Sequence, residues 1–254
     1  MLKKLSILAI AGLTLSSYAQ ADTAGFEIGA YQWTPDYSGV FAVDNGNQLG
    51  TSIDIRDDLG FTDENHNIIW VSLEHPVPFL PNFKIVFSDL DVSSTIDIED
   101  EIVFGEETFP LAATVTTRVD MSNIEYTFYY ELLDNWINLD AGLTLRQYDG
   151  LITLAIDAPS NISESEALDF TIPLLYVKGR VDLPLTGFFV DGEINIISFN
   201  GDSLSDTALS VGYESEIGLG AKAGYRTFSM EVEESDFTSD LEFKGAYVSV
   251  FFHF

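Results

Sequence analysis

The chain offers three histidines as acid–base groups, in 254 residues that contain no cysteine. His66 follows the acidic residues Asp63 and Glu64, and a histidine oriented by a carboxylate is the pairing that activates a nucleophile in many hydrolases. A catalytic site also needs a nucleophile that meets this pair in space, and no such partner is evident in the sequence. His75 lies in a proline-rich segment and His253 at the end of the chain, where structural roles are more typical. We therefore predict that the protein is not an enzyme, and keep a rim enzyme acting on lipid or peptide as the second alternative.

Carboxylates dominate the charge, with 41 acidic residues against 11 basic ones and a net charge of −30. Nucleic acid is excluded as a partner, because phosphate contacts need a basic face. Clustered carboxylate oxygens bind hard cations such as Ca²⁺, and the segment DIEDE (97–101) is dense, but no D-x-[DN]-x-[DN]-G loop occurs. We expect the acidic loops to be a solvated, repulsive surface and the protein to need no cofactor. Calcium or another divalent cation at these loops is the alternative.

A further set of charged residues alternates with apolar ones. Between residues 136 and 146 every second side chain is apolar, and Asp140 and Arg146 fall between them. The same two-residue period occurs over residues 175–183, with Lys178 on the polar face. Such a period is typical of β-strands that separate two environments. The charged residues that this pattern places on the interior face are Lys84, Glu125, Glu131, Asp140, Arg146, Lys178, Arg180, Asp191, Glu193, Lys222 and Arg226.

These interior charges have two interpretations. Opposite charges could pair and fill a narrow lumen, since unpaired charge is costly wherever hydration is poor. They could instead line a path for ions or small solutes. Barrels of about ten strands lie nearer to the small barrels filled by side chains than to the 16-stranded porins. We favour the plugged lumen and keep a small passive channel as the first alternative.

Strand length and loop spacing favour a membrane barrel over a soluble sandwich. The strands reach about ten residues, as a tilted bilayer crossing requires, and short connections alternate with longer, more acidic ones. We predict an all-β fold, a transmembrane antiparallel up-and-down β-barrel of about ten strands, with eight or twelve as alternatives and both termini periplasmic. The predicted strands are residues 25–34, 66–74, 83–96, 111–132, 136–156, 169–183, 187–199, 207–214, 217–234 and 241–254.

Two segments leave alternatives open. Residues 35–65 either form a hairpin above the membrane or extend the first strand. Near Ser122 and Asn123, the apolar positions run out of phase with those that precede them. That change indicates either a β-bulge or the rim of the membrane.

The N-terminus reads as an export signal. A basic MLKK is followed by an apolar run of eleven residues, LSILAIAGLTL, and then by Ala19 and Ala21 in A-x-A positions. The run is too short to span a bilayer and suits a signal-peptide core. We predict that residues 1–21 are a cleaved signal peptide and that residues 22–254 form the barrel domain. Loss of Lys3 and Lys4 with the signal would make the mature chain still more acidic.

The C-terminus, GAYVSVFFHF, ends on a bare aromatic residue. It resembles the C-terminal signal that bacterial outer-membrane barrels present to their insertion machinery. Pairing of this last strand with the first would leave no open sheet edge in the membrane. The residues predicted to form this assembly signal are Val248, Val250, Phe252 and Phe254.

Longer segments carry a more specific resemblance: SLEHPVPFLPNFKIVFSDLD, LTLRQYDG, IPLLYVKGRVDLPLTGFFVDGEIN and AGYRTFSM. With the FFHF ending, they resemble a gammaproteobacterial family of outer-membrane proteins of about this length, named for genomes with Gly-Gly C-terminal sorting systems. The resemblance implies an outer-membrane β-barrel and brings no activity. We therefore expect a structural or surface-binding role in a Gram-negative outer membrane, with membrane lipids and lipopolysaccharide as neighbours.

Overall fold

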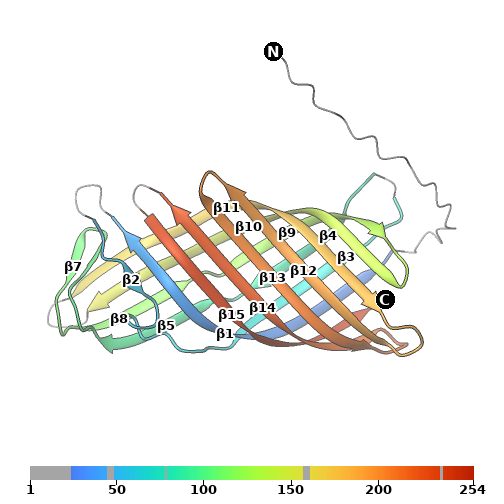
Figure 1. Ribbon diagram of the computed structural model, residues 1–254, viewed down its shortest axis with the longest axis horizontal. Helices are drawn as coiled ribbons and strands as arrows, with labels where there is room; N and C mark the ends of the chain where they lie inside the picture. Colours follow the sequence, from blue (N-terminus) through green and yellow to red (C-terminus); the bar gives the residue numbers. More distant parts are fainter. Residues whose placement is uncertain (1–23, 45–48, 78, 157–160, 235–236) are drawn as a thin grey trace, which may run out of the picture.

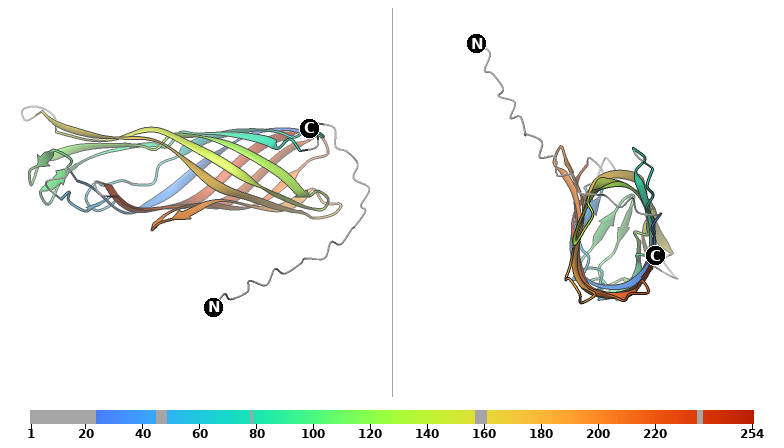
Figure 2. Two further views of the ribbon diagram at one scale, coloured as in Figure 1. Left: turned by 90° about the horizontal axis from the view of Figure 1, so that it is seen from above. Right: turned by 90° about the vertical axis from the view of Figure 1, so that its right-hand side faces the viewer.

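A computed structural model describes residues 24–44, 49–77, 79–156, 161–234 and 237–254. Ten antiparallel strands close into one barrel (Figures 1 and 2). Closure comes from β1 and β15, whose ends are joined by a hydrogen bond from Phe26 N to Phe254 O of 2.8 Å. In the order in which they pair, the strands are β1 (Phe26–Val43), β3 (His66–Leu73), β4 (Asn82–Ser88), β9 (Asn123–Leu133), β10 (Ile137–Ile156), β11 (Ile162–Asp182), β12 (Phe188–Phe199), β13 (Asp202–Glu214), β14 (Leu219–Glu233) and β15 (Phe237–His253).

The barrel has two unlike ends, called here proximal, where Phe254 lies, and distal (Figure 1). Proximal connections are short, and in one of them Gly218 has a φ of +80°. A Cβ there would lie 1.8 Å from the carbonyl oxygen of His253, so the turn requires glycine. Shorter strands extend the distal end: β2 (Ile53–Asp54) on β1, β8 (Thr114–Asp120) on β10, β5 (Asp91–Asp97) on β8, and the hairpin of β6 (Ile102–Phe104) and β7 (Glu107–Phe109).

Apolar side chains change sides along the barrel. On β15, Val248 and Val250 point outward and are more than half exposed. Farther along the same strand, Leu241 and Phe243 point inward and are buried, while Lys244 lies outside. Since the alternation keeps its parity throughout, the proximal half has an apolar belt for lipid, and the distal half has an apolar interior and a polar outer surface.

The predicted barrel of ten strands is confirmed, and the structure decides between the alternatives for residues 35–65 and for the region of Ser122 and Asn123. The first strand extends to Val43, and the strand predicted over residues 111–132 is interrupted between β8 and β9. Val119 on one side of this break and Glu125 on the other are both buried inside. Odd-numbered residues therefore face the barrel interior in both β8 and β9. The strand does not change its facing; instead, the apolar residues change from the inward set in β8 to the outward set in β9, and this change marks the membrane rim.

The prediction was wrong about three distal segments. Residues 162–168, 202–206 and 237–240 were expected in loops, but they belong to β11, β13 and β15. Their outward residues are polar because this part of the wall lies beyond the apolar belt. A strand rich in polar residues has a composition similar to that of a loop, which is why these segments were not predicted as strands. The predicted signal peptide lies outside the described residues. Within them, no helix is long and apolar enough to cross a membrane.

Candidate ligand-binding cavity

The barrel interior consists of three layers. The proximal layer is a polar vestibule of about 300 Å³. The middle layer is packed with charged side chains and leaves only about 70 Å³. The distal layer is an apolar cavity of about 510 Å³. We call the middle layer the floor; its residues are Lys84, Glu125, Arg146, Asp191, Glu193, Asp206, Lys222 and Arg226.

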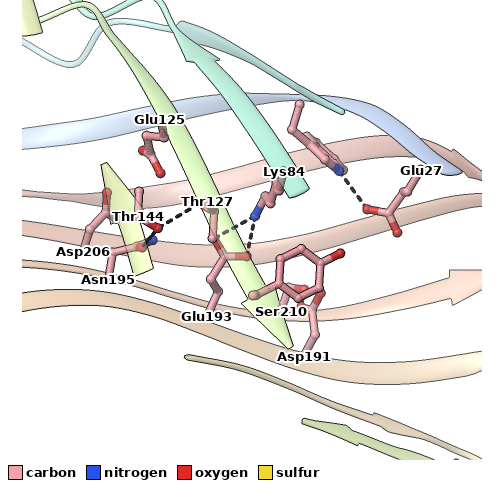
Figure 3. Close-up of polar contacts among 12 residues, drawn as sticks. Glu27, Lys84, Glu125, Thr127, Thr144, Asp191, Glu193, Asn195, Asp206 and Ser210 are labelled. Carbon is pink, nitrogen blue, oxygen red and sulfur yellow. Dashed lines mark hydrogen bonds and ion pairs between the residues drawn. The ribbon is translucent and has the colours of Figure 1, made fainter. Parts of the chain in front are cut away.

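Some ion pairs of the floor join neighbouring strands, such as Arg146–Glu125, and others cross the barrel. The Lys84 ammonium donates to both carboxylate oxygens of Glu193, at 2.8 and 2.7 Å (Figure 3). Lys84 is on β4 and Glu193 on β12, which are not neighbours in the wall. A second chain of hydrogen bonds runs from Thr127 through Thr144 to Asn195, at 2.8 and 2.7 Å. The floor is therefore a cross-linked polar network.

Two arginines share one carboxylate at the distal side of the floor. Arg146 and Arg226 each place Nη2 2.6 Å from Asp206 Oδ2, and Arg146 also lies 2.8 Å from Glu125 Oε1. Asp206 is only 6% exposed. Asp206 is not among the predicted interior charges, because residues 200–206 fall between two predicted strands. Paired charge of this kind is stable only as a set, since removing one partner leaves an uncompensated buried ion.

The other predicted interior charges lie proximal to the floor. Lys178 lines both the floor and the vestibule, and Asp140 is buried beside the vestibule. Glu131 also lines the vestibule but is exposed. Arg180 bonds Asp182 and Glu214 at the proximal end. The predicted assembly residues Val248, Val250 and Phe252 are 63, 61 and 40% exposed on the outer face of β15, and Phe254, directly after the strand, is 69% exposed.

The apolar cavity occupies the distal half of the barrel, directly beyond the floor. The Arg226 guanidinium lies 4.5 Å from the ring centroid of Trp33, which belongs to the cavity wall. The charged floor and the aromatic wall of the cavity are therefore in direct contact. Aromatic and aliphatic residues supply most of the lining, including Phe61, Met230 and Phe243. A concave, mainly apolar volume of this size is typical of small-molecule sites.

The short distal strands and turns carry apolar residues that pack against the cavity lining in one continuous cluster, and we call this distal part the roof. Ile53, Leu59, Phe104 and Phe109 are fully buried within it. Phe41, which lines the cavity, packs edge-on against Phe104 with ring centroids 6.3 Å apart. The roof thus packs against the distal side of the cavity, and the floor lies on the other side.

His66 is a buried polar residue of the cavity wall. It begins β3 beyond the apolar belt and is 4% exposed. Its Nδ1 lies 3.1 Å from the carbonyl oxygen of Asp89, so Nδ1 carries the proton, and Nε2 accepts from the Tyr37 hydroxyl. Burial lowers the pKa of His66 and raises the pKa of Tyr37, so both groups are neutral.

Each of the three histidines has its own hydrogen-bonding partners. His66 bonds Tyr37 and a backbone carbonyl, rather than a serine hydroxyl or a carboxylate. His75 contacts the carbonyl oxygen of Pro81, and His253 pairs with Glu214. The part of the chain that the structure describes contains no group of three or more histidine, aspartate or glutamate residues placed to hold a metal ion.

The sequence of β11 contains a signal for the cavity. In residues 168–172, Leu168, Phe170 and Ile172 alternate with Asp169 and Thr171. The apolar set faces the cavity. In the proximal half of the same strand the outward set is the apolar one, so the inversion marks the boundary between lipid and water.

No protein-family model matches the chain, and no curated protein matches it. Among solved structures, the outer-membrane protease OmpT from Escherichia coli matches with a TM-score of 0.56 and 8% identity, over 92% of this chain and 98% of that one. The CymD monoaromatic hydrocarbon channel (TM-score 0.36, 9% identity, 90% of this chain and 69% of that one) and the Ralstonia pickettii toluene transporter TbuX (0.37, 12%, 91% and 63%) also match. The OmpT likeness establishes the outer-membrane β-barrel fold and nothing further.

Proposed function

We propose that this protein is a surface-binding barrel of the outer membrane that takes up hydrophobic small molecules in its distal cavity. The observation that carries the proposal is the apolar cavity of about 510 Å³ held between a packed roof and an ion-paired floor. Filling such a volume with apolar ligand would remove apolar surface from water, which contributes roughly 25 cal/mol per Å².

The floor argues against the alternative of a passive channel. Its remaining space is about 70 Å³, and its charges are paired across the barrel by contacts such as Lys84–Glu193. A conducting path would require these pairs to separate. In planar bilayers we therefore expect no stepwise conductance from the native protein. Regular unitary steps would favour the channel instead.

The His66 environment argues against an enzyme acting at the rim. A neutral histidine bonded to a tyrosine hydroxyl and a backbone carbonyl orients no nucleophile. The pair is better suited to giving a ligand one hydrogen-bonding point within an apolar wall.

The position of the barrel in the membrane follows from its apolar residues, which point outward in the proximal half and inward in the distal half. We propose that the apolar belt lies in outer-membrane lipid, that the polar distal half projects outside the cell among lipopolysaccharide, and that both termini face the periplasm. The exposed row from Val248 to Phe254 would contact the insertion machinery. Nucleic acid remains an unsuitable partner for so acidic a chain. We also propose that the chain belongs to the family named for Gly-Gly sorting systems, because the four segments quoted from the sequence resemble that family.

Photolabelling tests the proposed binding directly. The full barrel in lipid nanodiscs is irradiated with dodecanol that carries a diazirine near the end of its chain, and the labelled residues are mapped by mass spectrometry. Label should reach inward residues of the cavity such as Leu204 and Met230, as well as the outward belt. Excess dodecanol should suppress the cavity label.

A cavity-filling variant provides the control. Val92 and Val119 are cross-strand partners that both line the cavity. The double substitution V92F/V119F should reduce labelling of Leu204 and Met230 and leave belt labelling unchanged. Label confined to the belt in the native protein would show that the cavity does not bind the probe.

A further inference from the structure

The barrel wall has a gap beside the cavity. The ladder between β11 and β12 runs from Asp182–Phe189 to Leu175–Ile196 and stops there. β11 continues to Ile162, paired on that stretch with β10 alone. Pro173, just beyond the last pair, has no N–H to donate, and a proline within a sheet suits an edge position.

The gap opens into the cavity. Leu168 and Phe170 line the cavity from β11, and Ile197 and Phe199 line it from β12. Phe199 is 77% exposed beside the turn that ends the β12–β13 hairpin, so cavity surface continues to the outside at this point. We call this opening the mouth.

The mouth lies at the edge of the apolar belt. Leu175 and Ile196, the last paired residues, are 60 and 39% exposed outward and belong to the belt. The next outward residues of β11 beyond Pro173 are Thr171 and Asp169, which are polar. A molecule dissolved in the adjacent lipid leaflet would thus meet the mouth at the boundary between lipid and water.

Negative charge surrounds the mouth. Glu166, Asp202, Glu231 and Glu234 line the cavity; Asp202 pairs with Phe199 of the mouth, and Glu231 pairs with the next residue, Ser203. Within the described residues, the cavity lining includes no lysine or arginine. An anionic head group held here would be repelled by several carboxylates, and a cationic one would be attracted.

We infer that the ligand is a single-chain amphiphile with a neutral or cationic polar end, which enters the mouth tail first from the membrane surface. The inference rests on the proposed binding function and names its substrate class and route. The chain occupies the apolar cavity, and the polar end stays among the carboxylates of the mouth. Amphiphilic carboxylates are disfavoured, because their charge has the same sign as the mouth.

Three compounds of equal chain length test the charge preference in nanodiscs. Dodecanol, dodecylamine and dodecanoate compete with the photoreactive dodecanol, and cavity labelling is followed at Leu204 and Met230. Dodecanol and dodecylamine should compete, and dodecanoate should be weaker by roughly tenfold, as expected for like charges about 10 Å apart in a partly screened site.

Charge reversal at the mouth provides the matched comparison. E231K/E234K should bring dodecanoate to the level of dodecanol or better and weaken dodecylamine. E99K/D100K makes the same change of net charge in an exposed loop between β5 and β6, and should leave the order of the compounds unaltered.

Blocking the mouth tests the route. Because the chain has no cysteine, F199C can be modified selectively with a bulky maleimide, and L185C, fully exposed in a proximal turn, serves as the control. Modified F199C should lose most cavity labelling, and modified L185C should keep it.

The outcomes separate the two proposals. Cavity labelling that all three compounds suppress equally, or that survives modification of F199C, overturns the amphiphile class or the route and leaves binding intact. No cavity labelling in the unmodified native protein overturns the proposed function itself.

Discussion

Lys84 Nζ lies 2.7 Å from Glu193 Oε2, although the two residues stand on strands that do not touch in the barrel wall. The pair crosses the lumen, with side chains only 13 and 26% exposed. Together with the two arginines that share Asp206, it divides the interior into a polar proximal part and an apolar distal part.

Removal of one partner of this pair should destabilise the barrel. K84M leaves the Glu193 carboxylate without its ammonium partner, and we expect a loss of about 3 kcal/mol in the free energy of unfolding. Urea unfolding in lipid vesicles measures it. The double variant K84M/E193M should recover most of the loss, because no unpaired charge remains. A single variant as stable as the native protein would mean that the pair contributes little to the floor.

The neutral state of His66 predicts a pH dependence of stability. Burial lowers its pKa in the folded protein below the ordinary value of 6.5, so the unfolded chain binds the proton more readily. The contribution is complete above pH about 6.5 and declines as the pH falls through that value toward the folded pKa.

The H66Q variant isolates this contribution. Subtracting its unfolding free energies from those of the native protein cancels the titration of other groups, His253 included. The difference should shrink as the pH is lowered from 7.5 to 5.5. A difference that is constant over this range would contradict a neutral, buried His66.

The proposed orientation can be read from cysteine accessibility. Ser165 lies on the outward face of the distal half, and Thr186 lies in a proximal turn, and both are exposed. On intact cells, a membrane-impermeant maleimide should modify S165C and not T186C. After outer-membrane permeabilisation, both should react. Modification of T186C alone on intact cells would show the barrel to be inverted.

Deletion of Phe254 should impair assembly more than stability. Its ring touches Phe26, at 5.3 Å between centroids, but it is 69% exposed. Full burial of such a side chain contributes only about 1.5–3 kcal/mol, so an exposed one contributes less. The deleted protein should refold in detergent nearly as well as the native one, while its membrane-inserted amount in cells falls severalfold. Equal losses in both assays would make Phe254 a packing residue.

The sequence was sufficient to predict the barrel of ten strands. Polar residues such as Asp140 and Arg146 alternate with apolar ones in any strand that separates two environments, so the alternation shows which residues share a face. It does not reveal whether lipid or water lies outside that face. The predicted strand therefore begins only at residue 169, and Leu168 falls in a predicted loop, although it follows the same period as Phe170 with the apolar side turned inward.

Pairing across the lumen could not be predicted in this way. Lys84 meets Glu193 because strand tilt and barrel closure bring β4 and β12 to the same height, and neither is encoded in local periodicity. Asp206 was missed for the reason that hid the cavity, since its segment was assigned to a loop. The gap beyond Leu175 had one local sign, Pro173, whose meaning depends on which neighbour the strand has.

The central claim is that the distal cavity binds an apolar chain, and the most direct measurement is a crystal structure of the full barrel soaked with 12-bromododecan-1-ol, recorded at the bromine absorption edge. We predict an anomalous peak inside the barrel, between Trp33, Met230 and Phe243, distal to the Arg226–Asp206 pair. The V92F/V119F variant should weaken that peak. Anomalous signal found only along the outer belt, beside residues such as Val248 and Leu209, with an empty cavity in the native protein, would contradict the account.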